Sequence, residues 1–157
     1  MILYHGSSLA IPKPDIIHSR DRVDFGKGFY TTPLLTQARN WSARFVRLNQ
    51  QGIVSKYILD EEALKVGKVL DFSSYSEEWL DFIVSCRSGK DHTDYDIVIG
   101  GVANDRIFNT IQLYFSDLIT KEETISRLRY EEPNQQICFR TQKIIDRFLH
   151  YEGCEQL

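Results

Sequence analysis

Short apolar segments of strand length alternate along this chain with longer segments in which apolar residues recur every three or four positions. This alternation predicts strands interleaved with amphipathic helices. The predicted strands are Ile2–His5, Ile53–Leu59, Val69–Phe72, Tyr95–Ile99 and Gln136–Phe139. The predicted helices are Leu34–Leu48, one from Ser76 to near Gly89, Ile107–Phe115, Thr120–Leu128 and Ile144–Leu149. The expected fold is therefore a mixed α+β domain with mostly antiparallel strands, the last of which is Gln136–Phe139.

One domain, spanning residues 1–157, fits this length and composition. A chain of this size buries roughly two thirds of the surface that its unfolded form exposes, which is enough for a core without disulfides. No segment approaches the run of about 18 apolar residues that a membrane-spanning helix needs, and the N-terminus lacks the features of a secretory leader. We therefore expect a cytoplasmic protein that does not associate with a membrane and whose three cysteines are free thiols.

Charge and histidine spacing argue against two classes of site, with a local basic patch as the alternative to the first argument. The net charge of −3 argues against strong nonspecific binding to nucleic acid, because such binding draws on a basic surface. His18, His92 and His150 show no spacing typical of metal ligands, so no metal site is predicted. The alternating charges of Arg20–Asp24 predict a solvated loop, with contact to a pyrophosphate as the alternative.

Local signals mark where two of the helices begin. Thr32 followed by Pro33 predicts an N-cap with proline at the first helical position. Trp41 then falls on the predicted buried face of that helix, at helical spacing from the other apolar residues. Thr120, three residues before Glu123, predicts a capping box at the start of a second helix.

A histidine ends the first predicted strand. His5 precedes Gly6 and Ser7, so its imidazole is expected at a sheet edge beside accessible backbone. That arrangement suits the binding of a ribose hydroxyl. The alternative is a histidine that is hydrogen-bonded locally, and this is the more common situation for a single histidine.

A double-glycine turn, Gly26-Lys27-Gly28, leads into Phe29 and Tyr30. The glycines let the backbone bend tightly and approach a ligand, and neighbouring residues of a strand point to opposite faces. One ring is therefore expected in the core, and the other is presented for stacking. The spacing fits neither a Rossmann nor a Walker loop. The alternative is an ordinary glycine turn before a strand.

These two segments together resemble the ADP-ribosyltransferase superfamily, in the branch built on a His-Tyr-Glu triad that includes the poly(ADP-ribose) polymerases. The first strand of that branch has the pattern Leu-x-His-Gly-Ser/Thr, which Leu3–Ser7 matches. Its second motif, Phe-Gly-Lys-Gly-Ile-Tyr, is similar to Phe25–Tyr30. A second stacking aromatic follows in that branch as an Asn-Tyr pair, for which this chain has Asn40-Trp41.

The third motif of the branch, Asn-Glu-Tyr-Ile-Val-Tyr followed by a glutamine, is similar to Asn134–Phe139 with Gln142. Gln135 stands where the branch has its catalytic glutamate. Breaking the nicotinamide glycosidic bond gives the ribose oxocarbenium character, which a carboxylate stabilises. Glutamine keeps a hydrogen bond but lacks the charge, a loss that costs about a hundredfold to a thousandfold in rate. Glu131 and Glu132 are an alternative source of a carboxylate, although a pair before proline is more often a solvated loop.

The resemblance implies an ADP-ribosyltransferase-like split β-sheet sandwich with flanking helices, which binds NAD as a cosubstrate in a cleft between two small sheets. The Gly6 backbone would bind the nicotinamide carboxamide, and the nicotinamide ring would stack on Tyr30 and Trp41. The implied catalytic residues are His5, Tyr30 and Gln135. Further NAD contacts are predicted at Ser7 and Gly28.

The segment Asn104-Asp105-Arg106 opens a helix after a strand and a glycine pair. Exposed amides and a guanidinium at this place suit an anionic group, such as a phosphate of NAD. The alternative, equally supported by the sequence, is that Asp96 or Asp105 pairs with Arg106 and fixes the loop.

Tyr95–Gly100 followed by Ala103–Arg106 is similar to a poorly characterised bacterial branch of the same superfamily, often found beside small regulatory genes. The resemblance implies a toxin or modifier that transfers ADP-ribose to a protein or nucleic-acid acceptor, with a small antitoxin or regulatory protein as a partner. One alternative is a noncatalytic member that binds NAD, a nucleotide or a protein, for which Gln135 is the main support. The other is removal of an RNA 2′-phosphate, which the acidic balance disfavours.

Overall fold

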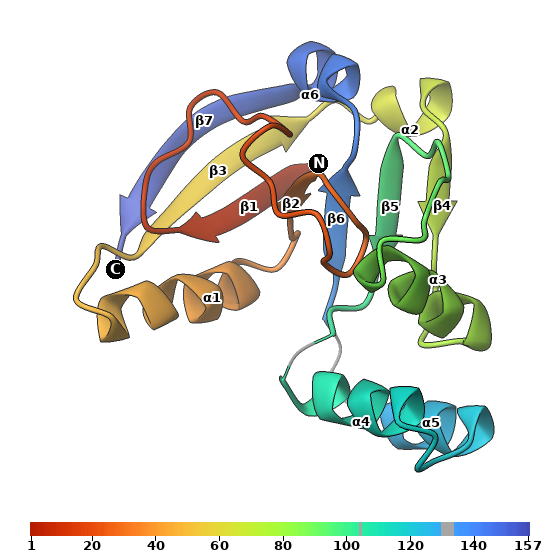
Figure 1. Cartoon of the computed structure of the whole chain (residues 1–157). Helices are drawn as coiled ribbons and strands as arrows, with labels where there is room; N and C mark the ends of the chain where they lie inside the picture. The colour runs from red at the N-terminus through yellow and green to blue at the C-terminus, as the bar shows by residue number, and fades with distance from the viewer. Residues whose placement is uncertain (104, 130–133) are drawn as a thin grey trace.

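The computed structural model describes residues 1–103, 105–129 and 134–157, and for residue 105 the backbone alone (Figure 1). One sheet contains β1 (Ile2–Ser7), β3 (Ile53–Leu59) and β7 (Leu149–Gln156). The other contains β2 (Phe29–Thr31), β6 (Gln136–Phe139), β5 (Ile97–Gly100) and β4 (Val69–Asp71). The helices are α1 (Leu35–Arg47), α2 (Ala63–Val66), α3 (Glu77–Arg87), α4 (Asp105–Phe115), α5 (Lys121–Leu128) and α6 (Gln142–Phe148).

The two sheets are mainly antiparallel. The three-stranded sheet has the order β1-β3-β7 and the four-stranded sheet the order β2-β6-β5-β4. Among the ladders of the described residues, β4 pairs with β5 in parallel and the others are antiparallel. A single antiparallel bridge between Tyr4 and Thr32 joins β1 to the end of β2. The expected α+β class with mostly antiparallel strands is confirmed.

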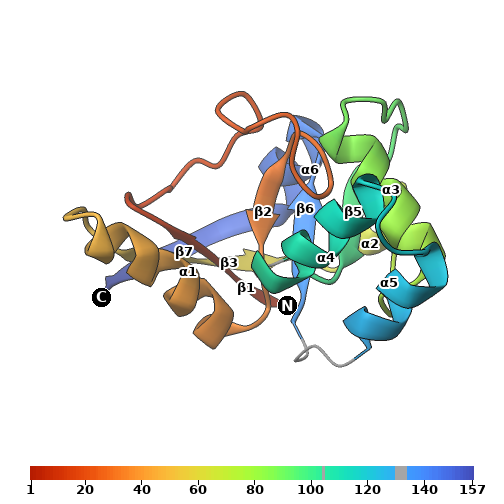
Figure 2. The same ribbon diagram turned by 60° about the horizontal axis from the view of Figure 1, so that its bottom comes forward.

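The four-stranded sheet is buried on both faces, which divides the core into two clusters. Alternate residues such as Ile97 and Ile99 face the three-stranded sheet and pack with Leu3 and Tyr57. Their neighbour Val98 faces the opposite way and packs with Trp79 and other residues of α3, α4 and α5. Figure 2 shows α3 and α5 on the side of β5 and β6 opposite α1. The strands therefore read as continuous apolar runs, as strands covered on both faces do.

Helix α1 lies against β1 through small groups. A Cβ atom added to Gly6 would lie 2.4 Å from the Ala38 carbonyl oxygen and 2.7 Å from Ser42 Oγ. Ala38 and Ser42 are the buried residues of α1. Trp41 is 47% exposed, so the expectation that it lies on the buried face is wrong. The physical reason is the close approach of helix and strand, which excludes a large ring from their contact.

The start of α1 also differs from the prediction. The Thr32 backbone exchanges hydrogen bonds with Tyr4, at 2.8 and 2.9 Å, and is therefore extended rather than part of the helix. The N-cap is Leu34, and the Thr32 hydroxyl accepts a hydrogen bond from the Leu34 amide at 3.1 Å. Thr32 thus supports the turn before α1, but the predicted N-cap at this residue is wrong.

The segment after α6 is a strand, contrary to the prediction that Gln136–Phe139 is the last one. Leu149 ends the helical turn and begins β7, which pairs with β3 up to Gln156. Buried or half-buried side chains alternate along β7 with exposed ones. Most of its residues are polar because one face of this edge strand meets solvent, so the apolar alternation is weak.

Two predicted helix starts are confirmed by their hydrogen bonds. Ser76 Oγ accepts from the Trp79 amide at 3.1 Å, and Thr120 Oγ1 accepts from the Glu123 amide at 3.1 Å. Within the described residues, no helix has both the length and the apolar character needed to cross a membrane. The three cysteines are free.

Candidate functional site

Strands β1 and β2 separate beyond the Tyr4–Thr32 bridge. In an antiparallel strand, residues two apart direct their N–H and C=O groups to the same side. Since Tyr4 bonds to Thr32, the N–H and C=O of Gly6 point toward β2. Within the described part of the chain, no backbone hydrogen bond joins Gly6 to β2. A donor and an acceptor on one peptide segment therefore face the split between the two strands.

His5 bridges this split through its side chain. Its Nδ1 lies 2.6 Å from the Tyr30 carbonyl oxygen, and its ring stacks on Phe29 with the centroids 4.6 Å apart. A carbonyl oxygen accepts, so Nδ1 carries the proton and Nε2 of the neutral ring is an acceptor. Burial lowers the pKa of His5 below its usual 6.5, while the bond to the Tyr30 carbonyl opposes that shift. The alternative of a locally hydrogen-bonded histidine is therefore confirmed. This hydrogen bond uses Nδ1, so Nε2 can still accept a hydrogen bond from a ligand.

The lowered pKa of His5 predicts a loss of stability on acidification. Between the folded pKa and about 6.5, the unfolded chain binds a proton that the folded chain does not, so the free energy of unfolding falls as the pH falls. Below the folded pKa both states are protonated, and the loss levels off. Between pH 7.5 and 5.5, the Tm of the native protein should drop further than that of His5→Gln. The control is the exposed His150→Gln, and equal drops in the native protein and His5→Gln would contradict the prediction.

Tyr30 is held by the glycine turn that precedes it. Its hydroxyl donates a hydrogen bond to the Gly26 carbonyl at 2.6 Å and accepts one from the Phe25 amide at 2.9 Å. Desolvation raises the pKa of Tyr30 well above its usual range. Phe29 enters the core between the sheets, and Tyr30 packs on the opposite face, as the alternation predicts. A Cβ atom on Gly28 would lie 2.5 Å from Cys138 Sγ, which is too close for a side chain. Glycine at this position therefore allows the turn to pack directly against β6.

Gln135 is tied to α1 through its backbone. The Gln37 side chain accepts a hydrogen bond from the Gln135 backbone amide at 3.1 Å and donates one to the Gln135 carbonyl at 2.9 Å. Trp41 follows Gln37 by one helical turn, and the Arg44 guanidinium lies 3.4 Å from the centre of the Trp41 ring. The side chain of Gln135 is exposed. Gln135 and Trp41 are therefore both positioned by the same helix that contacts Gly6.

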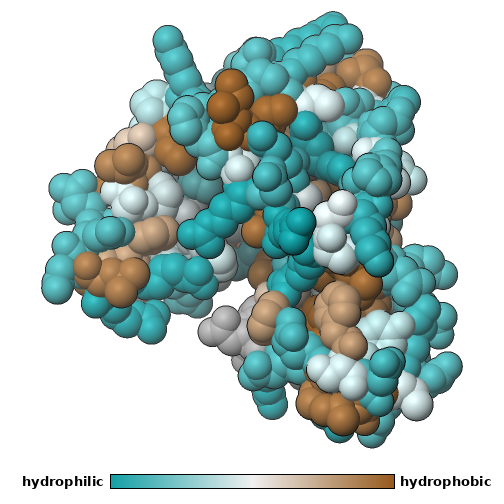
Figure 3. All heavy atoms as spheres, in the orientation of Figure 1, coloured by the Kyte–Doolittle hydropathy of each residue, from teal (hydrophilic) through white to brown (hydrophobic). Residues whose placement is uncertain are grey.

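The predicted site residues do not all gather at the split. Ser7 is at the end of β1 and donates to the nearby Leu9 carbonyl at 2.5 Å. Arg106 is exposed in the first turn of α4, in the helical layer on the other face of the four-stranded sheet. Figure 3 shows the surface notched between the part around α1 and the part around α4 and α5. His5 and Gly6 lie beside the backbone of Tyr30, whereas the Tyr30 ring packs with the cluster on the other face of the four-stranded sheet. Ser7 and Arg106 have separate surroundings.

The model of a family described as a protein of unknown function, DUF3990, matches residues 1–151. The chain belongs to this family. It matches no curated protein and no solved structure.

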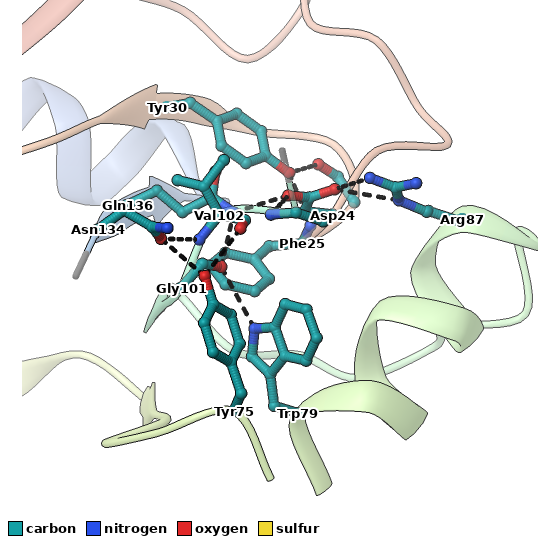
Figure 4. A network of polar contacts seen from close by, with 12 residues as sticks. Asp24, Phe25, Tyr30, Tyr75, Trp79, Arg87, Gly101, Val102, Asn134 and Gln136 are labelled. Atoms are coloured by element: carbon teal, nitrogen blue, oxygen red, sulfur yellow. Dashed lines mark hydrogen bonds and ion pairs between the residues drawn. The ribbon is translucent and has the colours of Figure 1, made fainter. Parts of the chain in front are cut away.

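The DUF3990 chain also contains a buried polar network that the sequence did not reveal (Figure 4). Asp24, 8% exposed, accepts from Arg87 Nε at 3.0 Å and Nη2 at 2.5 Å through Oδ1. Its Oδ2 accepts from the Ala103 amide and from Gln136 Nε2, both at 2.9 Å. The expectation that Arg20–Asp24 is a solvated loop is therefore wrong for Asp24. Gln136, a polar residue in an otherwise apolar strand, was the available signal.

Neighbouring polar residues fix the turn after β5. Asn134 Oδ1 accepts from the Val102 amide at 2.6 Å and from the Tyr75 hydroxyl at 3.0 Å. Asp96 accepts hydrogen bonds from the Lys68 amide at 2.9 Å and from the Thr141 hydroxyl at 2.8 Å, and the alternative of a pairing between Asp96 or Asp105 and Arg106 stays a prediction. The predictions on Asn104, Glu131, Glu132 and the Asp105 side chain lie outside the described residues.

The pockets of the described residues in this DUF3990 structure include two open ones that are lined by neither His5 nor Tyr30. One of about 530 Å³ includes Gly26, Lys27 and Arg140. One of about 870 Å³ includes Leu34 and Gln135. Across the described residues, no three His, Cys, Asp or Glu side chains are grouped so that they could hold a metal ion.

Proposed function

We propose that this protein binds NAD at the split between β1 and β2 and transfers ADP-ribose to a macromolecule. The observation that carries the proposal is the Gly6 segment, whose N–H and C=O face the split without a partner on β2. A primary carboxamide offers the complementary acceptor and donor, so nicotinamide would extend the strand edge by two hydrogen bonds. The separation of the two sheets beyond Tyr4 and Thr32 agrees with the split-sheet fold implied by the sequence motifs.

The other groups at the split suit the remaining parts of the nicotinamide riboside. Nε2 of His5 would accept a hydrogen bond from a ribose hydroxyl. Trp41 would stack on the nicotinamide ring, on the face that Arg44 does not cover. The bond between ribose C1′ and the nicotinamide nitrogen would break, nicotinamide would leave with the electron pair, and a nucleophile of the acceptor would bond to C1′ and lose its proton.

Gln135 favours a second function, in which NAD binds without rapid transfer. An amide at this position donates or accepts a hydrogen bond but supplies no negative charge to a developing ribose cation. A noncatalytic NAD-binding protein would keep the Gly6 and His5 contacts and lack turnover.

The binding step is tested with Trp41→Ala, because this exposed side chain can be removed without opening the core. Isothermal calorimetry of the native protein should detect NAD and nicotinamide at millimolar concentrations. Loss of one aromatic stack, about 0.5–1.5 kcal/mol, should weaken the binding of both by about two- to tenfold.

Leu48→Ala is the matched control, since Leu48 is a more exposed apolar residue at the end of the same helix. It should leave both affinities unchanged. Absence of binding by the native protein, or equal weakening in Trp41→Ala and Leu48→Ala, would exclude this site.

A further inference from the structure

The 870 Å³ pocket begins beside Gln135 and extends across the ends of β5 and β4. The lining includes Leu34 and Gln135, Leu128 of α5, and residues 71–77. Asp71 and Glu77 form its far wall, while the Tyr75 hydroxyl from the same segment reaches Asn134 at 3.0 Å. Its volume is within the range of about 300–1,000 Å³ that is usual for ligand sites. The pocket therefore offers a place for a group that belongs to the acceptor rather than to NAD.

The charges of the lining indicate what kind of group fits. Asp71 and Glu77 are exposed in the far wall, and neither forms a salt bridge among the described residues. Lys121, which pairs with Asp81, also interacts electrostatically with Glu77 from outside the lining. Arg129 is the cation in the described lining, which leaves one net negative charge. Phosphates would be repelled by such a wall, whereas an ammonium or guanidinium group would be attracted.

The sheet register gives the span from the carboxylates to Gln135. Asp71 pairs with Ile99, and Ile99 pairs with Ile137, so Asp71 lies two strands away from β6. Gln135 is two residues before Ile137. With usual strand spacing and rise, the Cα atoms of Asp71 and Gln135 are about 12 Å apart. An extended peptide covers this distance in about three to four residues.

We infer that the acceptor is a protein segment with a lysine or arginine side chain that enters this pocket, three or four residues from the residue that is modified beside Gln135. Asp71 and Glu77 bind the cation. This inference rests on the proposed function, because it places the modified residue at the nicotinamide end of the site. The negative charge of this pocket favours a protein acceptor over a nucleic acid.

The test uses three fluorescein-labelled heptapeptides of serine and glycine that differ in a central arginine, leucine or glutamate, and a labelled uridine hexamer. Fluorescence anisotropy should show that the arginine peptide binds the native protein at least about fivefold more tightly than the other probes. Asp71→Asn/Glu77→Gln should remove that preference. Glu78→Gln should retain it, since Glu78 shares the first turn of α3 with Glu77 but does not line the pocket.

Equal affinities for the three peptides, tighter binding of the uridine hexamer, or the same loss in Glu78→Gln would overturn the inference. NAD calorimetry on the same samples separates the two proposals. NAD binding without a preference for the arginine peptide rejects the acceptor pocket and leaves the proposed function standing. A preference for the arginine peptide that depends on Asp71 and Glu77 supports the acceptor pocket. Failure of NAD to bind rejects the proposed function.

Discussion

Asp24→Asn is expected to lower the free energy of unfolding by about 3–5 kcal/mol, the usual cost of removing one partner of a buried ion pair. Asparagine has nearly the same shape, but it leaves the largely buried Arg87 guanidinium without a counter-charge. Its Nδ2 group would also face donors, either the Ala103 amide and Gln136 Nε2 or, in the other orientation, the Arg87 guanidinium. Urea unfolding monitored by circular dichroism measures the change.

Asp21→Asn is the matched control, because it removes the same charge from an exposed side chain in the same loop. Its effect should stay within about 0.5 kcal/mol. Asp24→Asn/Arg87→Met should recover part of the loss, since the uncompensated charge is gone. If Asp24→Asn alone lowers the free energy of unfolding by less than about 1 kcal/mol, the hydrogen-bond network shown in Figure 4 does not stabilise the loop as described.

The strands that the sequence predicted well are those whose apolar runs are continuous. Ile53–Leu59 and Gln136–Phe139 have the predicted bounds, because each run is buried over nearly its whole length. β7 was missed because an edge strand with one solvent face needs few apolar residues. Leu149 fits the helical spacing of the residues before it, and the sequence did not show that the period changes there.

The position of Trp41 shows a different limit of pattern analysis. Helical spacing identifies a stripe of large apolar residues, and such a stripe is normally the buried one. Here the buried face is the one with Ala38 and Ser42, because Gly6 allows α1 to touch β1. Recognising this needs the helix and the strand together, since neither segment indicates the contact alone.

The residues of the candidate site could be singled out where they are close in sequence. His5 and Gly6 occupy one short strand, and Phe25–Tyr30 one turn, so local motifs sufficed to single them out. Asp24 bonds to Arg87 across 63 positions and to Gln136 across 112. The fold alone creates such contacts, and a single sequence carries no record of which distant residues meet.

Gln135→Glu is expected to raise NAD hydrolysis, or transfer of labelled ADP-ribose to lysate proteins, by about a hundredfold to a thousandfold, if the position faces the reacting ribose. The substitution is nearly isosteric, and Gln37 holds residue 135 through its backbone, so the fold should survive. The exposed carboxylate would be ionised at pH 7 and would stabilise the developing cation at C1′.

Gln51→Glu adds the same charge at an exposed position outside both pockets and should leave the rate unchanged. A lower rate in Gln135→Glu, with a further loss in Gln135→Ala, would mean that the glutamine serves the native reaction as a neutral hydrogen-bonding group. Equal rates in the native protein, Gln135→Glu and Gln135→Ala would instead show that residue 135 is not at the reacting centre. The match of Asn134–Phe139 to the third motif would then be mistaken, because that match predicts that the charge of residue 135 controls the barrier.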